Sequence, residues 1–156
     1  MKLISQVLVL SLSLVSTLAH AESCTPASDS CGFYTCMETQ AQCGTEGYLT
    51  SFGGPLCRAY LDHEPKLSNN LQTWFPKVRY CLQAALLQIG DQVKCDELDQ
   101  KAFASHFDCY VSTGFCELTF RDQFEIIHLT GLEAMLNPSV IEVGLRVERH
   151  CHGLNY

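Results

Sequence analysis

Ten cysteines between Cys24 and Cys151 restrict what this chain can fold into more than any other feature. Cys81, Cys95 and Cys109 are spaced by fourteen residues each, and the residues between them are apolar at a helical period. Fourteen residues advance about 21 Å along a helix axis, whereas a disulfide requires Cα atoms within about 7 Å. Neighbouring cysteines here therefore cannot easily pair along one helix, and we expect disulfides that join helices to other helices.

The first 21 residues have the pattern of a secretory signal peptide. Lys2 is a short basic region, an apolar run diluted by serines covers Val7–Leu18, and Ala19-His20-Ala21 has the small residues that signal peptidase needs. The run is shorter than the roughly 20 apolar residues of a transmembrane helix. We expect a secreted, extracellular protein with no membrane insertion, in which residues 22–156 form one domain.

All ten cysteines follow the expected cleavage site, and an even number in a short secreted chain indicates five disulfides. A zinc site is disfavoured because no C-x-x-C pair occurs. Counting alone cannot choose among the hundreds of full pairings that ten cysteines allow.

The charge balance narrows the class of partner. Without Lys2, nine basic residues stand against 17 acidic ones, a net charge of −8. An acidic surface argues against nucleic acid or an anionic membrane as the main partner.

Start and stop signals divide the first half of the mature chain into helices. Asp29 or Ser30 can cap a first helix that stops at Gly44, and 44–54 is expected to be a loop. Pro55 suits the first turn of a short second helix that reaches Leu61.

After a turn over 62–70, a third helix is expected to end at Gly90, with Pro76 at its start or kinking it. Acidic residues just after Cys95 open a fourth helix, which Gly114 interrupts.

Thr119 and Asp122 resemble a capping box that begins a fifth helix, which contains Phe124, Ile127, His128 and Leu132. Asn137-Pro138 is a cap followed by a first-turn proline, and it opens the last helix. This helix contains Val140, Ile141, Leu145 and Val147, and it ends near Cys151, with Gly153 as the stop. The expected fold class is therefore all-α, a disulfide-stapled antiparallel helical bundle.

Two groups of residues invite a metal interpretation. Asp96, Glu97 and Asp99 could suggest calcium, but their spacing is not that of an EF-hand loop, and acidic residues in a first turn ordinarily complement the helix dipole. His150 and His152 flank Cys151, yet at a helix end they point apart. We expect no metal and no cofactor.

The sequence also favours a protein that is not an enzyme. His63 with Glu64, or His106 with Asp108, could be drawn as acid–base pairs, but nothing places a nucleophile beside either pair. Hydrolase, metalloprotease and phosphate-binding motifs are absent, and paired cysteines leave no spare thiol. No catalytic residue is predicted.

Trp74, Phe75 and Tyr80 form the densest aromatic group. Such residues anchor protein interfaces, but a chain of this size also needs them in its core, and we favour the core.

The cysteine ladder resembles that of the stanniocalcin family. The gaps of 4, 23, 6 and 34 residues agree with that family's pattern, as does the 13 between Cys95 and Cys109. Cys31-Gly32-Phe33-Tyr34-Thr35-Cys36-Met37-Glu38 is similar to the family's C-G-x-F-x-C-L-E-N, and Thr45-Glu46-Gly47-Tyr48 to its T-D-G-M. Cys109-Tyr110 matches its C-Y, so the resemblance spans Cys24–Cys151.

This resemblance implies a connectivity that the residues alone leave open. Carried over position by position, the family's pairs are Cys24–Cys36, Cys31–Cys57, Cys43–Cys95, Cys81–Cys109 and Cys116–Cys151.

Some features differ from the family. The segment between Cys43 and Cys57 is longer, that between Cys81 and Cys95 is slightly shorter, and the N-x-T acceptor is replaced by Thr39-Gln40-Ala41-Gln42. The family's subunit-linking cysteine has no counterpart after Cys151, so we expect a monomer or a non-covalent homodimer.

The resemblance implies a secreted, non-enzymatic, hormone-like regulator of calcium and phosphate balance. Such a protein works by binding an extracellular protein, either a receptor or a secreted pappalysin-type metalloproteinase. The alternative is a helical carrier of lipid or another apolar ligand. A carrier predicts an enclosed apolar cavity of some hundreds of Å³, whereas a regulator predicts a filled core.

Overall fold

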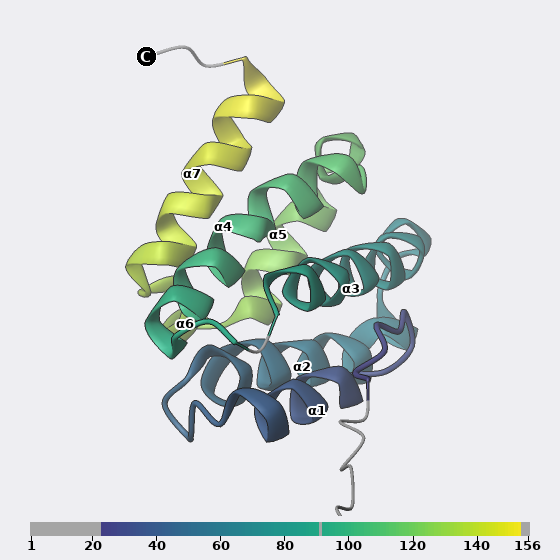
Figure 1. Cartoon of the computed structure of the whole chain (residues 1–156). Helices are drawn as coiled ribbons and strands as arrows, with labels where there is room; N and C mark the ends of the chain where they lie inside the picture. Colours follow the sequence, from purple (N-terminus) through teal and green to yellow (C-terminus); the bar gives the residue numbers. More distant parts are fainter. Residues whose placement is uncertain (1–22, 91, 154–156) are drawn as a thin grey trace, which may run out of the picture.

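The computed structural model describes residues 23–90 and 92–153, and within them the fold is an all-α, disulfide-stapled bundle without strands (Figure 1). The expected signal peptide, residues 1–21, lies outside the described residues. The helices in chain order are α1 (Gly32–Ala41), η1 (Leu49–Gly53), α2 (Gly54–His63), η2 (Glu64–Lys66), α3 (Asn69–Ile89), α4 (Cys95–Ser112), η3 (Phe115–Glu117), α5 (Phe120–Thr130), α6 (Leu132–Met135) and α7 (Pro138–His152). In Figure 1, α1 lies beside α2, and α7 packs along α4 at the opposite end of the molecule.

Five disulfides tie the helices, and the segments on either side of α1, to one another. The pairs are Cys24–Cys36, Cys31–Cys57, Cys43–Cys95, Cys81–Cys109 and Cys116–Cys151, which are the five that the stanniocalcin pattern implies. Their Cα atoms are 5.1–5.9 Å apart. Cys81–Cys109 holds α3 and α4 as an antiparallel hairpin, and Cys116–Cys151 ties η3 to the end of α7. Each bridge restricts the unfolded chain and contributes about 2–4 kcal/mol, although such contributions do not add simply.

Most helix boundaries follow the local signals in the sequence. Pro55 lies in the first turn of α2, and α3 ends at Gly90, as expected. Thr119 caps α5 by accepting a hydrogen bond from the backbone N–H of Asp122, and Asn137 caps α7 by accepting one from Ser139. α7 ends before Gly153, which adopts a left-handed backbone.

Three expectations for the first 60 residues differ from the structure. The N-cap of α1 is Cys31, although the Ser30 hydroxyl accepts a hydrogen bond from the Gly32 N–H at 3.1 Å, and the helix ends at Ala41 with a left-handed Gln42 rather than at Gly44. The expected loop over 44–54 contains the short π-helix η1, in which Leu49 is buried next to the buried Tyr48. A Cβ at Gly53 would lie within 2.7 Å of both the Tyr34 and Tyr48 rings, so only glycine permits this approach.

The third helix begins earlier than expected, at Asn69, because the Ser68 hydroxyl accepts a hydrogen bond from the Leu71 N–H. Pro76 therefore lies inside α3. Trp74 and Phe75 are buried as predicted, but Tyr80 is 52% exposed because it lies on the solvent side of the same helix.

The fifth helix ends at Thr130, where Gly131 has a φ of 81°, and Leu132 starts the separate helix α6. The expected fifth helix thus included Leu132, which the structure places in α6. Phe124, Ile127 and Leu132 are exposed, whereas Ile126 is buried together with Asp122 and Gln123. Polar side chains take inward positions here because hydrogen bonds satisfy them.

Asp122 joins the starts of two helices. Its carboxylate accepts hydrogen bonds from the hydroxyls of Ser68, at 2.6 Å, and Thr119, at 2.8 Å, and from the side-chain amide of Asn70, at 3.0 Å. These bonds, that from Ser68 above all, hold the pKa of Asp122 below its usual range. The N-termini of α3 and α5 are thereby linked.

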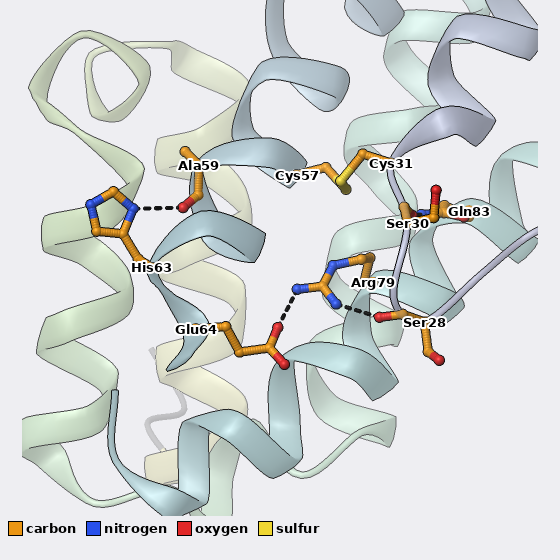
Figure 2. A network of polar contacts seen from close by, with 9 residues as sticks. All are labelled: Ser28, Ser30, Cys31, Cys57, Ala59, His63, Glu64, Arg79 and Gln83. Atoms are coloured by element: carbon orange, nitrogen blue, oxygen red, sulfur yellow. Dashed lines mark hydrogen bonds and ion pairs between the residues drawn. A yellow bond between two sulfur atoms is a disulfide. The ribbon is translucent and has the colours of Figure 1, made fainter. Parts of the chain in front are cut away.

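The N-terminal segment is attached to α3 by a polar network (Figure 2). Arg79, which is buried, forms an ion pair with Glu64 and donates a hydrogen bond to the carbonyl of Ser28. One turn further along α3, the buried Gln83 accepts from the Ala27 N–H and donates to the Ser30 carbonyl, both at 2.8 Å. Segment 27–30 has no helical backbone bonds of its own, so α3 supplies its partners.

We therefore predict that Arg79→Met destabilises the protein by about 2–4 kcal/mol, because it leaves Glu64 and the Ser28 carbonyl without their buried partner. Urea unfolding with the disulfides intact measures the change. Lys101→Met is the matched control, because Lys101 forms an exposed i,i+4 pair with Glu97 and should cost no more than about 0.5 kcal/mol. Equal losses in the two variants would contradict the role given to the network.

Candidate functional site

The acid–base pairs considered from the sequence are not assembled in the structure. His63 donates through Nδ1 to the carbonyl of Ala59 at 2.7 Å, whereas Glu64 faces Arg79 (Figure 2). His106 is buried, whereas Asp108 on the same helix is exposed. Each histidine thus has a partner other than the carboxylate beside it in the sequence.

The metal candidates are also separate. The carboxylate of Asp99 accepts a hydrogen bond from the Tyr48 N–H at 3.1 Å, and Glu97 pairs with Lys101. The His150 ring lies against Phe107, and His152 lies 3.2 Å from Glu148. Among residues 23–90 and 92–153, no three His, Cys, Asp or Glu side chains gather as a metal site would require.

The structure instead contains an apolar cleft of about 280 Å³. One side is formed by Ile126, Ile127 and Thr130 of α5 with Met135 of α6, and the other by one face of α7 from Val140 to Glu148. α4 and η3 contribute Phe103, His106, Tyr110 and Phe115, and Phe52 and Leu56 complete the lining.

The packing of the helices explains why this space is left. α7 packs on α4, whereas α5 packs on α2, so α5 and α7 approach each other mainly through the short helix α6. Gly144 also faces the cleft, and an added Cβ there would meet no atom within 4 Å. The cleft lies where two buried clusters meet, one around α1, η1 and the start of α4, the other around α3, η3 and α7.

Aromatic rings form one wall of the cleft. The Phe52 and Phe103 ring centroids are 4.9 Å apart, and the His106 ring stacks on Phe103 at 6.0 Å. Tyr48 packs edge-on against Phe103 at 5.1 Å behind this wall. Rings in such contacts are fixed by their neighbours, so this wall is rigid.

The protonation of His106 follows from its partners. Its Nδ1 lies 2.9 Å from the carbonyl oxygen of Ala102, which can only accept, so the proton of the neutral ring is on Nδ1. Nε2 then accepts from the Tyr48 hydroxyl at 3.4 Å. Burial lowers the pKa of His106 and raises that of Tyr48 well above its usual value, so both side chains stay neutral.

Two further polar side chains of the lining, Thr130 and Glu148, also have partners within the protein. Thr130 donates to the carbonyl of Ile126 at 2.8 Å and accepts from the Tyr60 hydroxyl at 2.5 Å. Glu148 is the one charged side chain of the lining, and it pairs with His152 at the exposed surface. Burial raises the pKa of Tyr110 to about 12, so it too is neutral. The interior of the cleft therefore presents mainly hydrocarbon, and the polar atoms of His106 and Thr130 are already bonded within the protein.

Sequence reasoning did not find this cleft. It named Val140, Ile141, Leu145 and Val147 as the apolar side of the last helix, but it did not name Val143 or Gly144. Only Val147 of the four is fully buried. The one available signal was the wide apolar coverage of this helix, which exceeds what a single packing face requires.

Compared with known proteins, the chain matches no protein-family model, no curated protein and no solved structure. In the described part of the chain, no helix combines the length and the apolar character that crossing a bilayer would take.

The buried His106 predicts a loss of stability in mild acid. Because its pKa is lowered in the folded state, only the unfolded chain takes up this proton just below the ordinary pKa of about 6.5. The free energy of unfolding should therefore fall as the pH drops below about 6.5, by at most about 1.4 kcal/mol per pH unit from this group.

Urea unfolding at pH 7.5 and at 5.5 measures this dependence in the native protein and in His106→Gln, which retains an acceptor for Tyr48. The variant should lose the part of the pH dependence that His106 causes. The exposed histidines 63, 128, 150 and 152 are common to both proteins and cancel in the comparison. The same decline in both would mean that His106 is not the group responsible.

Proposed function

We propose that this chain is a secreted, non-enzymatic regulator of the stanniocalcin type, acting through contacts with an extracellular protein. The partner would be a cell-surface receptor or a secreted pappalysin-type metalloproteinase, and the action hormone-like, in calcium and phosphate balance. The protein would act as a monomer or a non-covalent homodimer.

The observation that carries this proposal is the disulfide connectivity. All five bridges of the structure coincide with the pairs carried over from the stanniocalcin pattern, although ten cysteines allow hundreds of arrangements. Five disulfides also fit an oxidising, extracellular environment, where such bonds form and persist.

A second observation supports binding through the outer surface. Within residues 23–90 and 92–153, all but two of the large, exposed apolar side chains lie between Phe120 and Leu145, on α5, α6, α7 and the turn after α6. Phe120 is 83% exposed and Phe124 60%, one turn apart on α5. Exposed aromatic side chains of this kind supply most of the affinity at protein interfaces, and a cross-linked scaffold loses little conformational entropy on binding.

We predict that the double variant Phe120→Ser, Phe124→Ser binds such a partner at least tenfold more weakly, because both exposed rings are removed from the surface. Binding of the purified mature protein to a pappalysin-type metalloproteinase, and inhibition of that proteinase, are the measurements. Unfolding temperatures should be nearly unchanged, since both side chains are exposed.

Tyr80→Ser is the matched control for this experiment. It removes an aromatic ring that is 52% exposed on α3, away from α5–α7 in the sequence, and should leave affinity within about twofold. If the control and the double variant lose affinity equally, the assignment of the α5 surface fails. If the native protein binds neither the proteinase nor a cell-surface receptor, the regulatory function fails.

The apolar cleft supports a second candidate function, a carrier of lipid or another apolar ligand. The core is not completely filled, and the cleft, with a volume of about 280 Å³ and an apolar lining, supports a carrier, although it is open on one side and not the enclosed cavity that was expected. Organic extraction of the natively purified protein, followed by mass spectrometry, tests this function. A stoichiometric apolar compound is the expected result, and a protein free of such compounds that also takes none up contradicts it.

A further inference from the structure

The cleft between α5 and α7 has a lining that selects for the charge of its ligand. It contains no lysine or arginine, and its only charged side chain is Glu148. A carboxylate or phosphate group drawn into this space would lose its hydration without gaining a cation, which is strongly unfavourable. The acidic chain, with a net charge of −7, further disfavours anions.

Most polar atoms of the lining offer little to a polar ligand, and only the Tyr110 hydroxyl and the exposed Glu148 remain to meet one. The Thr130 hydroxyl already donates to Ile126 and accepts from Tyr60, and both nitrogens of His106 have protein partners. A ligand that must form several hydrogen bonds would therefore gain fewer here than it loses in water. The cleft fits a molecule whose buried part is hydrocarbon.

The volume sets the size of that molecule. A cavity of about 150 Å³ lined by apolar side chains holds benzene, with its six carbon atoms. A cleft of about 280 Å³ is roughly twice as large, so it accommodates about ten to twelve non-hydrogen atoms.

We propose that the cleft between α5 and α7 binds an uncharged, medium-chain amphiphile such as a fatty alcohol, with the hydrocarbon chain inside and the polar end at the mouth. This assignment names the ligand of the carrier function, and it rests on that function.

Displacement of a neutral fluorescent reporter, N-phenyl-1-naphthylamine, from the full mature protein at pH 8 tests the proposal. 1-Decanol and decanoate share one chain length and differ in charge. We expect 1-decanol to displace the reporter at a concentration at least tenfold lower than decanoate. Equal or tighter binding of decanoate would overturn the selectivity for uncharged ligands but leave a carrier function standing. If neither 1-decanol nor decanoate binds the folded protein, both the proposed ligand and the carrier function are overturned.

Substitutions at Gly144 locate the ligand. Gly144→Phe places a ring in the cleft, where a Cβ meets no atom within 4 Å, and should weaken 1-decanol binding at least tenfold. Gly144→Ala is the matched control and should bind within twofold of the native protein. Leu145→Trp, at a half-exposed lining position, serves the same purpose if the phenylalanine variant does not fold. Thermal unfolding establishes that each variant is folded.

Two further outcomes would overturn the assignment to the cleft. Leu132 is 78% exposed and lies outside the cleft lining, so Leu132→Ser should leave binding unchanged. If Leu132→Ser loses binding and Gly144→Phe keeps it, the ligand lies on the outer surface. Binding that falls as the protein dimerises in sedimentation experiments would show that a second copy covers the cleft instead.

Discussion

The fold depends first on covalent links between segments that lie far apart in the sequence. Cys43–Cys95 spans 52 residues and anchors the start of α4 beside the segment after α1, while Cys81–Cys109 fixes α4 against α3. The relative position of these helices is thus set by bonds as well as by packing, which suits a domain with two modest buried clusters in place of one large core. Non-covalent contacts position segments that these two bonds do not hold. The Arg79 network includes the ion pair with Glu64, and the Asp122 carboxylate links the starts of α3 and α5.

Local chemistry accounts for most of the fold that could be predicted from the sequence. Gly90 and the Asn137-Pro138 pair mark helix ends and starts because their effect is confined to one turn of backbone. The failures occur where distant residues decide. The segment at Leu49 packs into the core, where the Tyr34 and Tyr48 rings lie against Gly53, and Asp122 turns inward because Ser68 and Asn70, about 50 residues away, supply hydrogen bonds.

The cleft was beyond prediction for a related reason. Apolar periodicity reveals which side chains avoid water, but Val143 beside the cleft and Phe124 on the outside are equally apolar. Which of these side chains contacts a neighbouring helix depends on the distance between α5 and α7. That distance is set because α5 packs on α2, whereas α7 packs on α4. A cleft of this kind depends on how far apart two helices pack, and no single residue in the sequence indicates that distance.

The bond between Cys116 and Cys151 gives α7 a second attachment besides the peptide backbone. A protease cut anywhere in 131–137 would therefore produce a nicked, two-chain molecule in which α7 is still covalently retained. Such a molecule would run as a single species on a gel until a reductant separates the fragments. Nicking would also break the short connection through α6 to the start of α7, so this end of the helix would be freed while its far end stays bonded to η3.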